Sequence, residues 1–164
     1  MRWLAIADTN ECNGGGGGGD DDDSDDDDDI ILSQGICPSD GGPTPVGSVS
    51  STGNEFVMAD GGTVTLTDDG LVEATFEDLF RATDTSPTTY NAIFVTVVCT
   101  GNNPVSEHST DRADAVAPDA DGVVTISQTV DSFPDDCRGP VVLFRRDGTP
   151  TDSTNTFWLA ISCG

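Results

Sequence analysis

The chain has 164 residues, of which 35% are hydrophobic, and its formal net charge is −24 at pH 7. Its six cationic side chains are all arginines, because lysine is absent. Binding to phosphate groups needs a basic stripe, so this charge balance excludes nucleic acid as an expected partner and disfavours an anionic membrane surface. The length suits a single ordinary domain.

Aspartate is the dominant acidic residue and outnumbers glutamate 25 to 5. Without the nine aspartates among residues 20–29 the net charge is still −15, so the rest of the chain is strongly acidic as well. Abundant short carboxylates without lysine resemble the composition of haloarchaeal proteins, whose acidic surfaces stay soluble in concentrated salt. A GC-rich bacterial gene would produce a similar composition, so both sources stay open.

Residues 1–13 begin the chain with a short apolar run from Trp3 to Ala7. The run is shorter than the apolar region of an export signal, so we interpret 1–13 as the remnant of one. Cys12 followed by glycines resembles the mature start of lipoproteins. Residues 9–11 are Thr, Asn and Glu instead of small and apolar residues, so a lipid anchor at Cys12 is the less favoured alternative. No stretch is long enough for a transmembrane segment.

Residues 14–29 form a tract of six glycines followed by nine aspartates, interrupted by Ser24. Glycine loses much backbone freedom on ordering and like charges repel, so we predict a disordered tether that continues through a Gly/Pro-rich linker to residue 54. Its carboxylates are candidates for weak, non-specific binding of Ca²⁺ or another cation. A solvated spacer is the preferred interpretation, because a flexible site loses entropy at every binding event. The candidate ligands are Asp20, Asp21, Asp22, Asp23, Asp25, Asp26, Asp27, Asp28 and Asp29.

The folded domain is expected over residues 55–164, with a first short strand at 55–58. Residues 63–67 and 71–76 alternate apolar and polar side chains on either side of an Asp-Asp-Gly turn, which predicts a hairpin. In the second of these strands, alternate residues are expected to face the core or the water. Val72, Ala74 and Phe76 are the expected core residues, and Glu73, Thr75 and Glu77 the exposed ones.

The second half of the domain carries four further strand candidates and no convincing helix. Residues 91–99 are almost continuously apolar, which predicts a central strand buried on both faces. A long polar loop is expected over 100–121. The remaining strands are expected at 122–130, 140–144 and 156–162. About seven strands predict an antiparallel β-sandwich of immunoglobulin-like size, with a small β-barrel as the alternative.

Five cysteines and a single histidine, with no C-x-x-C pair, argue against a zinc site. We therefore expect two disulfides and an oxidising compartment, with buried free thiols as the alternative. If the strands at 91–99 and 140–144 are antiparallel neighbours, Cys99 lies close to Cys137. The last strand brings Cys163 to the same end, where Cys37 can reach it from the linker. The predicted pairs are Cys99–Cys137 and Cys37–Cys163.

Sequence motifs for catalysis or specific ion binding are weak in this chain. Asp119 to Gly122 matches only the start of a calcium loop, so a turn is the preferred interpretation. A small hydrolase using His108 stays a disfavoured alternative, because no G-x-S-x-G elbow accompanies this histidine. Glu73 and Glu77 are spread along one strand and do not indicate a glycosidase. The sequence thus predicts no enzyme and no cofactor.

These observations favour a non-enzymatic, exported or cell-surface domain of structural or adhesive type, displayed on a flexible acidic tether. Its expected location is extracellular or at the cell surface, with a protein or matrix partner there. The main alternative is a cation-binding module that uses the aspartate tract.

Overall fold

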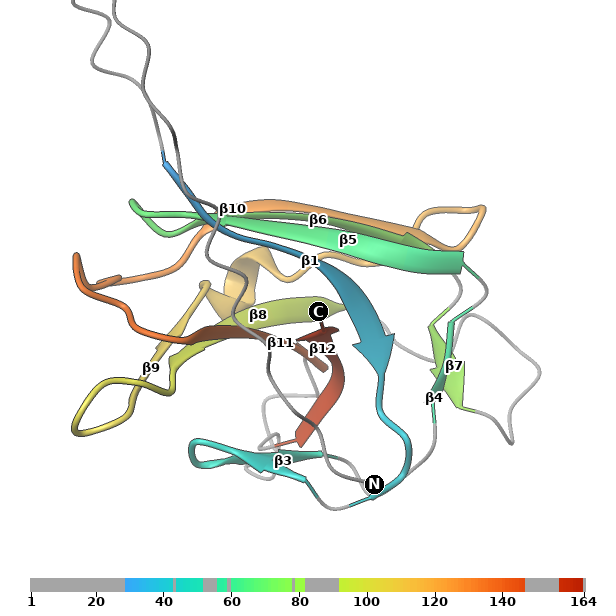
Figure 1. Cartoon of the computed structure of the whole chain (residues 1–164). Helices are drawn as coiled ribbons and strands as arrows, with labels where there is room; N and C mark the ends of the chain where they lie inside the picture. Colours follow the sequence, from blue (N-terminus) through green and yellow to red (C-terminus); the bar gives the residue numbers. More distant parts are fainter. Residues whose placement is uncertain are drawn as a thin grey trace, which may run out of the picture.

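The computed structural model describes residues 29–42, 44–51, 56–58, 60–77, 79–81, 92–146 and 157–163, which form an all-β fold (Figure 1). Its main strands are β1 (Ile30–Pro38), β5 (Asp60–Thr67), β6 (Leu71–Glu77), β8 (Ile93–Cys99), β9 (Ser106–Ser109), β10 (Val123–Thr129), β11 (Pro140–Arg146) and β12 (Phe157–Cys163). They form one curled antiparallel sheet in the order β10-β6-β5-β1-β12-β11-β8-β9, which makes a half-barrel. Short hairpin strands β2 (Pro45–Val46) and β3 (Val49–Ser51) flank β12, and β4 (Phe56–Val57) pairs with β7 (Phe80–Arg81).

Strand β1 joins the two layers of the fold. In Figure 1, β10, β6, β5 and the start of β1 lie above β8, β11 and β12. The first part of β1 pairs with β5, where Ser33 lies opposite Thr65, and its last part pairs with β12, where Cys37 lies opposite Ile161. The antiparallel all-β expectation is therefore confirmed, and the two layers of the expected sandwich belong to one continuous sheet.

The main core fills the space between the layers. In β6 the apolar residues at 72, 74 and 76 are buried while those at 73, 75 and 77 are exposed, as the alternation predicts. The rings of Phe76 and Phe144 meet edge to face across the core, with centroids 5.2 Å apart. Every residue of β8 is buried, because Val95 and Val97 face this core and Val98 packs into a second cluster with Val49 of the β2–β3 hairpin.

The folded part begins earlier than the expected boundary at residue 55. Strand β1 and the β2–β3 hairpin lie within the region assigned to the linker. Leu32 and Ile36 of β1 are only 7% and 4% exposed, and they face the main core. The region does have a period-two pattern, in which Ser33 and Gly35 are exposed between buried residues, but its glycine and proline content made the pattern difficult to recognise.

The polar connection at 100–121 also contains regular structure. It holds β9, which pairs with β8, and a short 3₁₀ helix over Arg112–Asp114. Val116 then forms a bridge to Ile93 at the beginning of β8. This segment therefore extends the lower layer and does not form a free loop.

Candidate functional site

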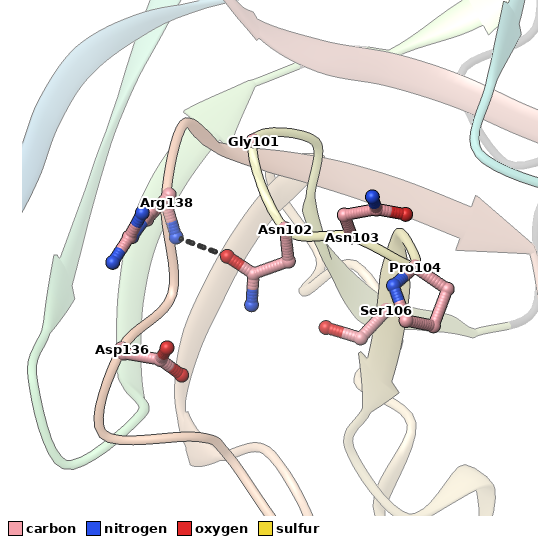
Figure 2. A pocket seen from close by; sticks show the side chains of 7 residues that line it. All are labelled: Gly101, Asn102, Asn103, Pro104, Ser106, Asp136 and Arg138. Atoms are coloured by element: carbon pink, nitrogen blue, oxygen red, sulfur yellow. Dashed lines mark hydrogen bonds between the residues drawn. The ribbon is translucent and has the colours of Figure 1, made fainter.

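A polar hollow of about 520 Å³ opens at the edge of the sheet where β8 ends and β11 begins (Figure 2). Two loops form it, one directly after β8 and one directly before β11. Its lining residues are Gly101, Asn102, Asn103, Pro104, Ser106, Asp136 and Arg138.

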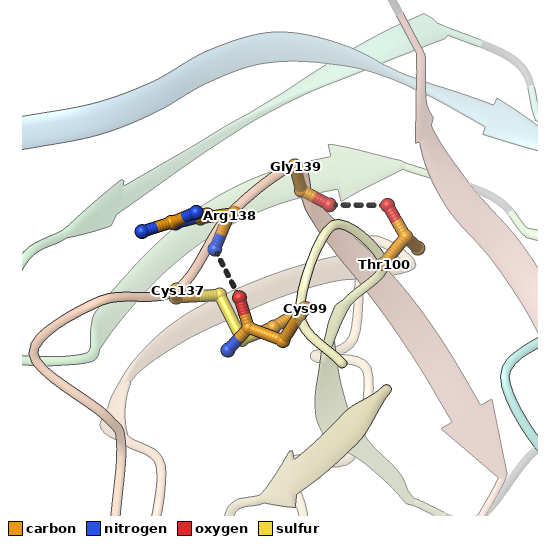
Figure 3. Close-up of a disulfide and its surroundings, with 6 residues drawn as sticks. Cys99, Thr100, Cys137, Arg138 and Gly139 are labelled. Carbon is orange, nitrogen blue, oxygen red and sulfur yellow. Dashed lines mark hydrogen bonds between the residues drawn. A yellow bond between two sulfur atoms is a disulfide. The ribbon is translucent and has the colours of Figure 1, made fainter. Parts of the chain in front are cut away.

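The two loops are fastened to each other by covalent and hydrogen bonds (Figure 3). Pro140 lies opposite Cys99 in the register of β8 and β11, so the end of β8 is adjacent to the start of β11. The Cys99–Cys137 disulfide joins the loops, with a Cα–Cα distance of 5.1 Å. The N–H and the hydroxyl of Thr100 both donate to the carbonyl of Gly139, at 3.2 and 2.7 Å. The frame of the hollow is therefore fixed before any ligand arrives.

Close backbone approach at this point requires glycine at position 101. Its N–H donates to the carbonyl of Arg138 at 2.7 Å. A Cβ atom on Gly101 would lie 2.9 Å from the Cβ of Arg138 and 3.0 Å from its carbonyl oxygen. Any side chain at residue 101 would thus separate the two loops.

Three polar side chains point toward one another within the hollow, as Figure 2 shows. The backbone N–H of Arg138 donates to Oδ1 of Asn102 at 3.0 Å, which leaves the Nδ2 donor of this amide turned into the hollow. The carboxylate of Asp136 and the hydroxyl of Ser106 approach from either side, and this buried hydroxyl has no hydrogen-bond partner among the residues that the structure describes. The amide donor of Asn102 and the carboxylate acceptor of Asp136 together match the hydroxyl groups of an uncharged ligand.

The structure contains the same two cysteine pairs that the strand arrangement predicts. The Cys37–Cys163 disulfide links β1 to β12, with a Cα–Cα distance of 5.8 Å. Gly35 lies opposite Cys163 and Cys37 opposite Ile161, so the two cysteines are diagonal neighbours on one face of the sheet. Cys37 thus belongs to a strand and not to the expected linker.

His108 lies on β9 and packs against Phe133, with the ring centroids 6.0 Å apart and the rings nearly perpendicular. Ser106 lies on the same face of β9, two residues earlier. Within the described part of the chain, neither Nε2 of His108 nor Oγ of Ser106 has a hydrogen-bond partner, so these two atoms are not bonded to each other. The structure therefore does not bring His108 and Ser106 together as a base and a nucleophile.

Of the candidate cation ligands, only Asp29 falls within the described residues. It is exposed, and its carbonyl accepts a hydrogen bond of 2.9 Å from the N–H of Asp68. Asp20 to Asp23, Asp25 to Asp28 and Cys12 lie outside the described residues. Within the described ranges, no three acidic, histidine or cysteine side chains gather closely enough to hold a metal ion.

The Asp119 to Gly122 segment forms a turn that leads into β10. One carboxylate oxygen of Asp119 accepts hydrogen bonds from the N–H groups of Asp121 and Val123, each at 2.9 Å. Gly122 has a φ of 84°, which glycine adopts readily. This geometry agrees with the turn interpretation of the motif.

A second polar cluster on the outer face of β8 was not foreseen from the sequence. The guanidinium groups of Arg145 and Arg112 lie 4.9 and 5.3 Å from the centre of the Phe94 ring. Arg145 donates a hydrogen bond of 3.1 Å to the hydroxyl of Thr96, and burial lowers the pKa of Arg145. The sequence carries one signal for this cluster. Alternate residues of a strand share a face, so residue 145 lies on the same face of β11 as Leu143.

Comparison with protein-family models, with curated proteins and with solved structures finds no match to this chain. Where the chain is described, it holds no helix of the length and apolar character that a membrane crossing requires. The candidate site is therefore supported by its geometry alone.

Proposed function

We propose that this chain is a non-enzymatic domain of structural or adhesive type, displayed on its acidic N-terminal tract at a cell surface or in an extracellular matrix. The observation that carries the proposal is the pair of disulfides in a small all-β domain. Disulfides persist in oxidising compartments and are rare where glutathione keeps thiols reduced.

The hollow beside the Cys99–Cys137 disulfide is the proposed point of contact. The two loops are fastened to each other and the Asn102 amide is held by its bond to Arg138, so little entropy is lost in these parts when a ligand binds. The net charge of −24 repels anionic ligands, while the amide donor of Asn102 and the carboxylate acceptor of Asp136 suit neutral hydroxyl groups. A neutral glycan of a cell wall or matrix has this chemistry.

Fractionation of the source cells tests the location. We expect the full chain in the surface or secreted fraction, with both disulfides recovered by peptide mapping without reductant. A protein found only in the cytosol with reduced cysteines would refute an exported role.

Binding to insoluble neutral polysaccharides tests the contact site. We expect the full chain to co-sediment with at least one of cellulose, chitin or mannan, and Asp136→Asn to lower the bound fraction. Asp135→Asn is the matched control, because this neighbouring exposed residue does not line the hollow. Equal loss in both variants would remove the hollow from the interaction.

A cation-binding role for the tract is a second candidate, and the nine carboxylates within ten residues favour it. Calorimetry with Ca²⁺ on the full chain and on a chain without residues 14–29 separates the two proposals. Weak binding that disappears with the deletion would support the tract as the cation site. Equal heats in both proteins would exclude it.

A further inference from the structure

The sheet ends in two strands with very different edges. At one end, β9 has four residues, and its Glu107 accepts hydrogen bonds from the N–H and hydroxyl of Ser48 in the β2–β3 hairpin. The carbonyl of Ser109 also accepts a hydrogen bond of 3.0 Å from the N–H of Asp131. At the other end, β10 has seven residues, and β6 is its only neighbour among the strands that the structure describes.

Hydrogen bonds at the two ends of β10 show which of its residues face outward. The carbonyl of Val123 accepts from the N–H of Asp119, away from β6, whereas the N–H of Val130 donates to the carbonyl of Gly70 on the β6 side. Because backbone groups alternate along a strand, residues 125, 127 and 129 direct their N–H and C=O groups to the open edge. The backbone bonds of the described residues include no partner for these groups beyond the sheet.

This open edge also lacks the usual protection against pairing. Natural edge strands carry lysine, proline or inward-facing charges that prevent another chain from adding to them. Strand β10 reads VVTISQT, with no charge and no proline, and Thr125, Ser127 and Thr129 are exposed. It is a long uncharged edge on a chain whose net charge is −24.

We infer that β10 pairs with β10 of a second copy of this chain, in antiparallel orientation, so that the two sheets become one. A neutral strand has no carboxylate that could attract a basic partner. A second copy of the same neutral strand can pair with it, because no like charges then face each other. A twofold axis at Ser127 places Ser127 opposite its own equivalent and Thr125 opposite Thr129. In this register, the outward N–H and C=O groups of residues 125, 127 and 129 all form hydrogen bonds with the second copy. The register does not require the carbonyl of Val123, which already accepts a hydrogen bond from the N–H of Asp119.

The acidic residues beyond the strand ends make this pairing dependent on salt. Asp119 and Asp121 precede β10 and Asp131 follows it, so the antiparallel arrangement brings the acidic ends of the two copies near each other. Screening lengths fall from about 10 Å at 0.1 M salt to about 3 Å at 1 M. We therefore expect association to strengthen as salt concentration rises.

Cysteine cross-linking tests the register directly. Facing residues of a hydrogen-bonded antiparallel pair have Cα atoms about 5.5 Å apart, which a disulfide can span. In a Cys12→Ser background, we expect Ser127→Cys to form a covalent dimer on mild oxidation in high salt. Thr75→Cys is the matched control, because this exposed residue of β6 lies opposite Thr125 and would be about 20 Å from its equivalent, three strand spacings across the sheet and four residues along it. Equal cross-linking of both variants, or none of Ser127→Cys, would overturn the inference.

Sedimentation velocity on the full chain provides an independent measurement. We expect the mass to double between low and high salt for the wild type and for Ser127→Ala, which keeps the N–H. Ser127→Pro removes an outward N–H without removing a bond to β6, so we expect it to stay monomeric with unchanged circular dichroism. A wild type that stays monomeric at every salt concentration would overturn the inference. Glycan binding by the hollow does not depend on this result.

Discussion

The guanidinium of Arg145 lies 4.9 Å from the centre of the Phe94 ring and links the outer faces of two adjacent strands, β11 and β8. The same side chain donates a hydrogen bond to Thr96. A planar guanidinium can stack on a ring while it donates in its own plane, and an ammonium cannot do both.

Replacing Arg145 by lysine is therefore not a conservative change. We expect Arg145→Lys to lower the free energy of unfolding by about 1 kcal/mol, the size of a partly desolvated cation–π contact. Arg138→Lys is the matched control at an exposed position on the rim of the hollow, with an expected change below about 0.5 kcal/mol. Urea unfolding of both variants measures the difference, and equal values would show that the ring contact contributes nothing.

Removing each disulfide separately is expected to reveal unequal contributions. Cys37 and Cys163 are 126 residues apart, whereas Cys99 and Cys137 are 38 apart. From loop-closure entropy, the first disulfide contributes about 5 kcal/mol and the second about 4 kcal/mol. Paired substitutions to alanine, compared by urea unfolding, should follow this order. The reverse order would mean that native contacts outweigh chain entropy at these sites.

Two adjacent glycines of β5 are expected to respond very differently to substitution by alanine. A Cβ on Gly62 would lie 2.5 Å from the Cβ of Phe76 and 2.6 Å from the carbonyl oxygen of Thr75, whereas a Cβ on Gly61 would meet nothing within 4 Å. We expect Gly62→Ala to cost about 2 kcal/mol of stability through overpacking. Gly61→Ala should change stability by less than about 0.5 kcal/mol. Thermal unfolding of the pair checks the prediction, which similar midpoints would contradict.

Asp69 in the β5–β6 turn gives a pH-dependent prediction. Its carboxylate accepts hydrogen bonds from the hydroxyl of Thr67 and from the N–H of Leu71, and these bonds lower the pKa of Asp69 below its ordinary value. A lowered pKa stabilises the fold above the unfolded-state pKa of about 4, and this contribution is lost as the pH falls through the lower folded-state value.

Thr67→Val should therefore raise the pKa of Asp69 toward its ordinary value. The free energy of unfolding of this variant should also fall less steeply below about pH 4, because Asp69 then contributes less stability that protonation can remove. An NMR titration of the Asp69 carboxyl carbon measures the pKa. Thr65→Val removes a hydroxyl elsewhere on β5 and should leave it unchanged; a shift in that variant alone would contradict the assignment.

The parts of the fold that depend on local pattern could be predicted from the sequence. The alternation around Val72 and the apolar run of β8 specify which faces are buried, because strand periodicity acts over a few residues. The cysteine pairs followed from the neighbour relation of β8 and β11, which places Cys99 beside residue 140. These predictions required only short-range pattern and one assumed pairing.

The parts that depend on distant partners could not be predicted in this way. Leu32 and Ile36 stand among glycine, serine and proline, and only pairing with β5 and β12 makes a strand of them. The hollow depends on the bond between Asn102 and Arg138, which are 36 residues apart and both lie in loops. Neither loop has a periodic pattern from which such a contact could be inferred.

The bond between Cys37 and Cys163 has a mechanical consequence. A pull on the N-terminal tract reaches the domain through β1, whose first residues can be peeled from β5 only as far as Cys37. There the covalent link passes the load straight to Cys163. When the load is held beyond Cys163, all residues between the two cysteines lie in a closed loop that the pull cannot extend. This loop includes the polar hollow and the whole core except Leu32 and Ile36.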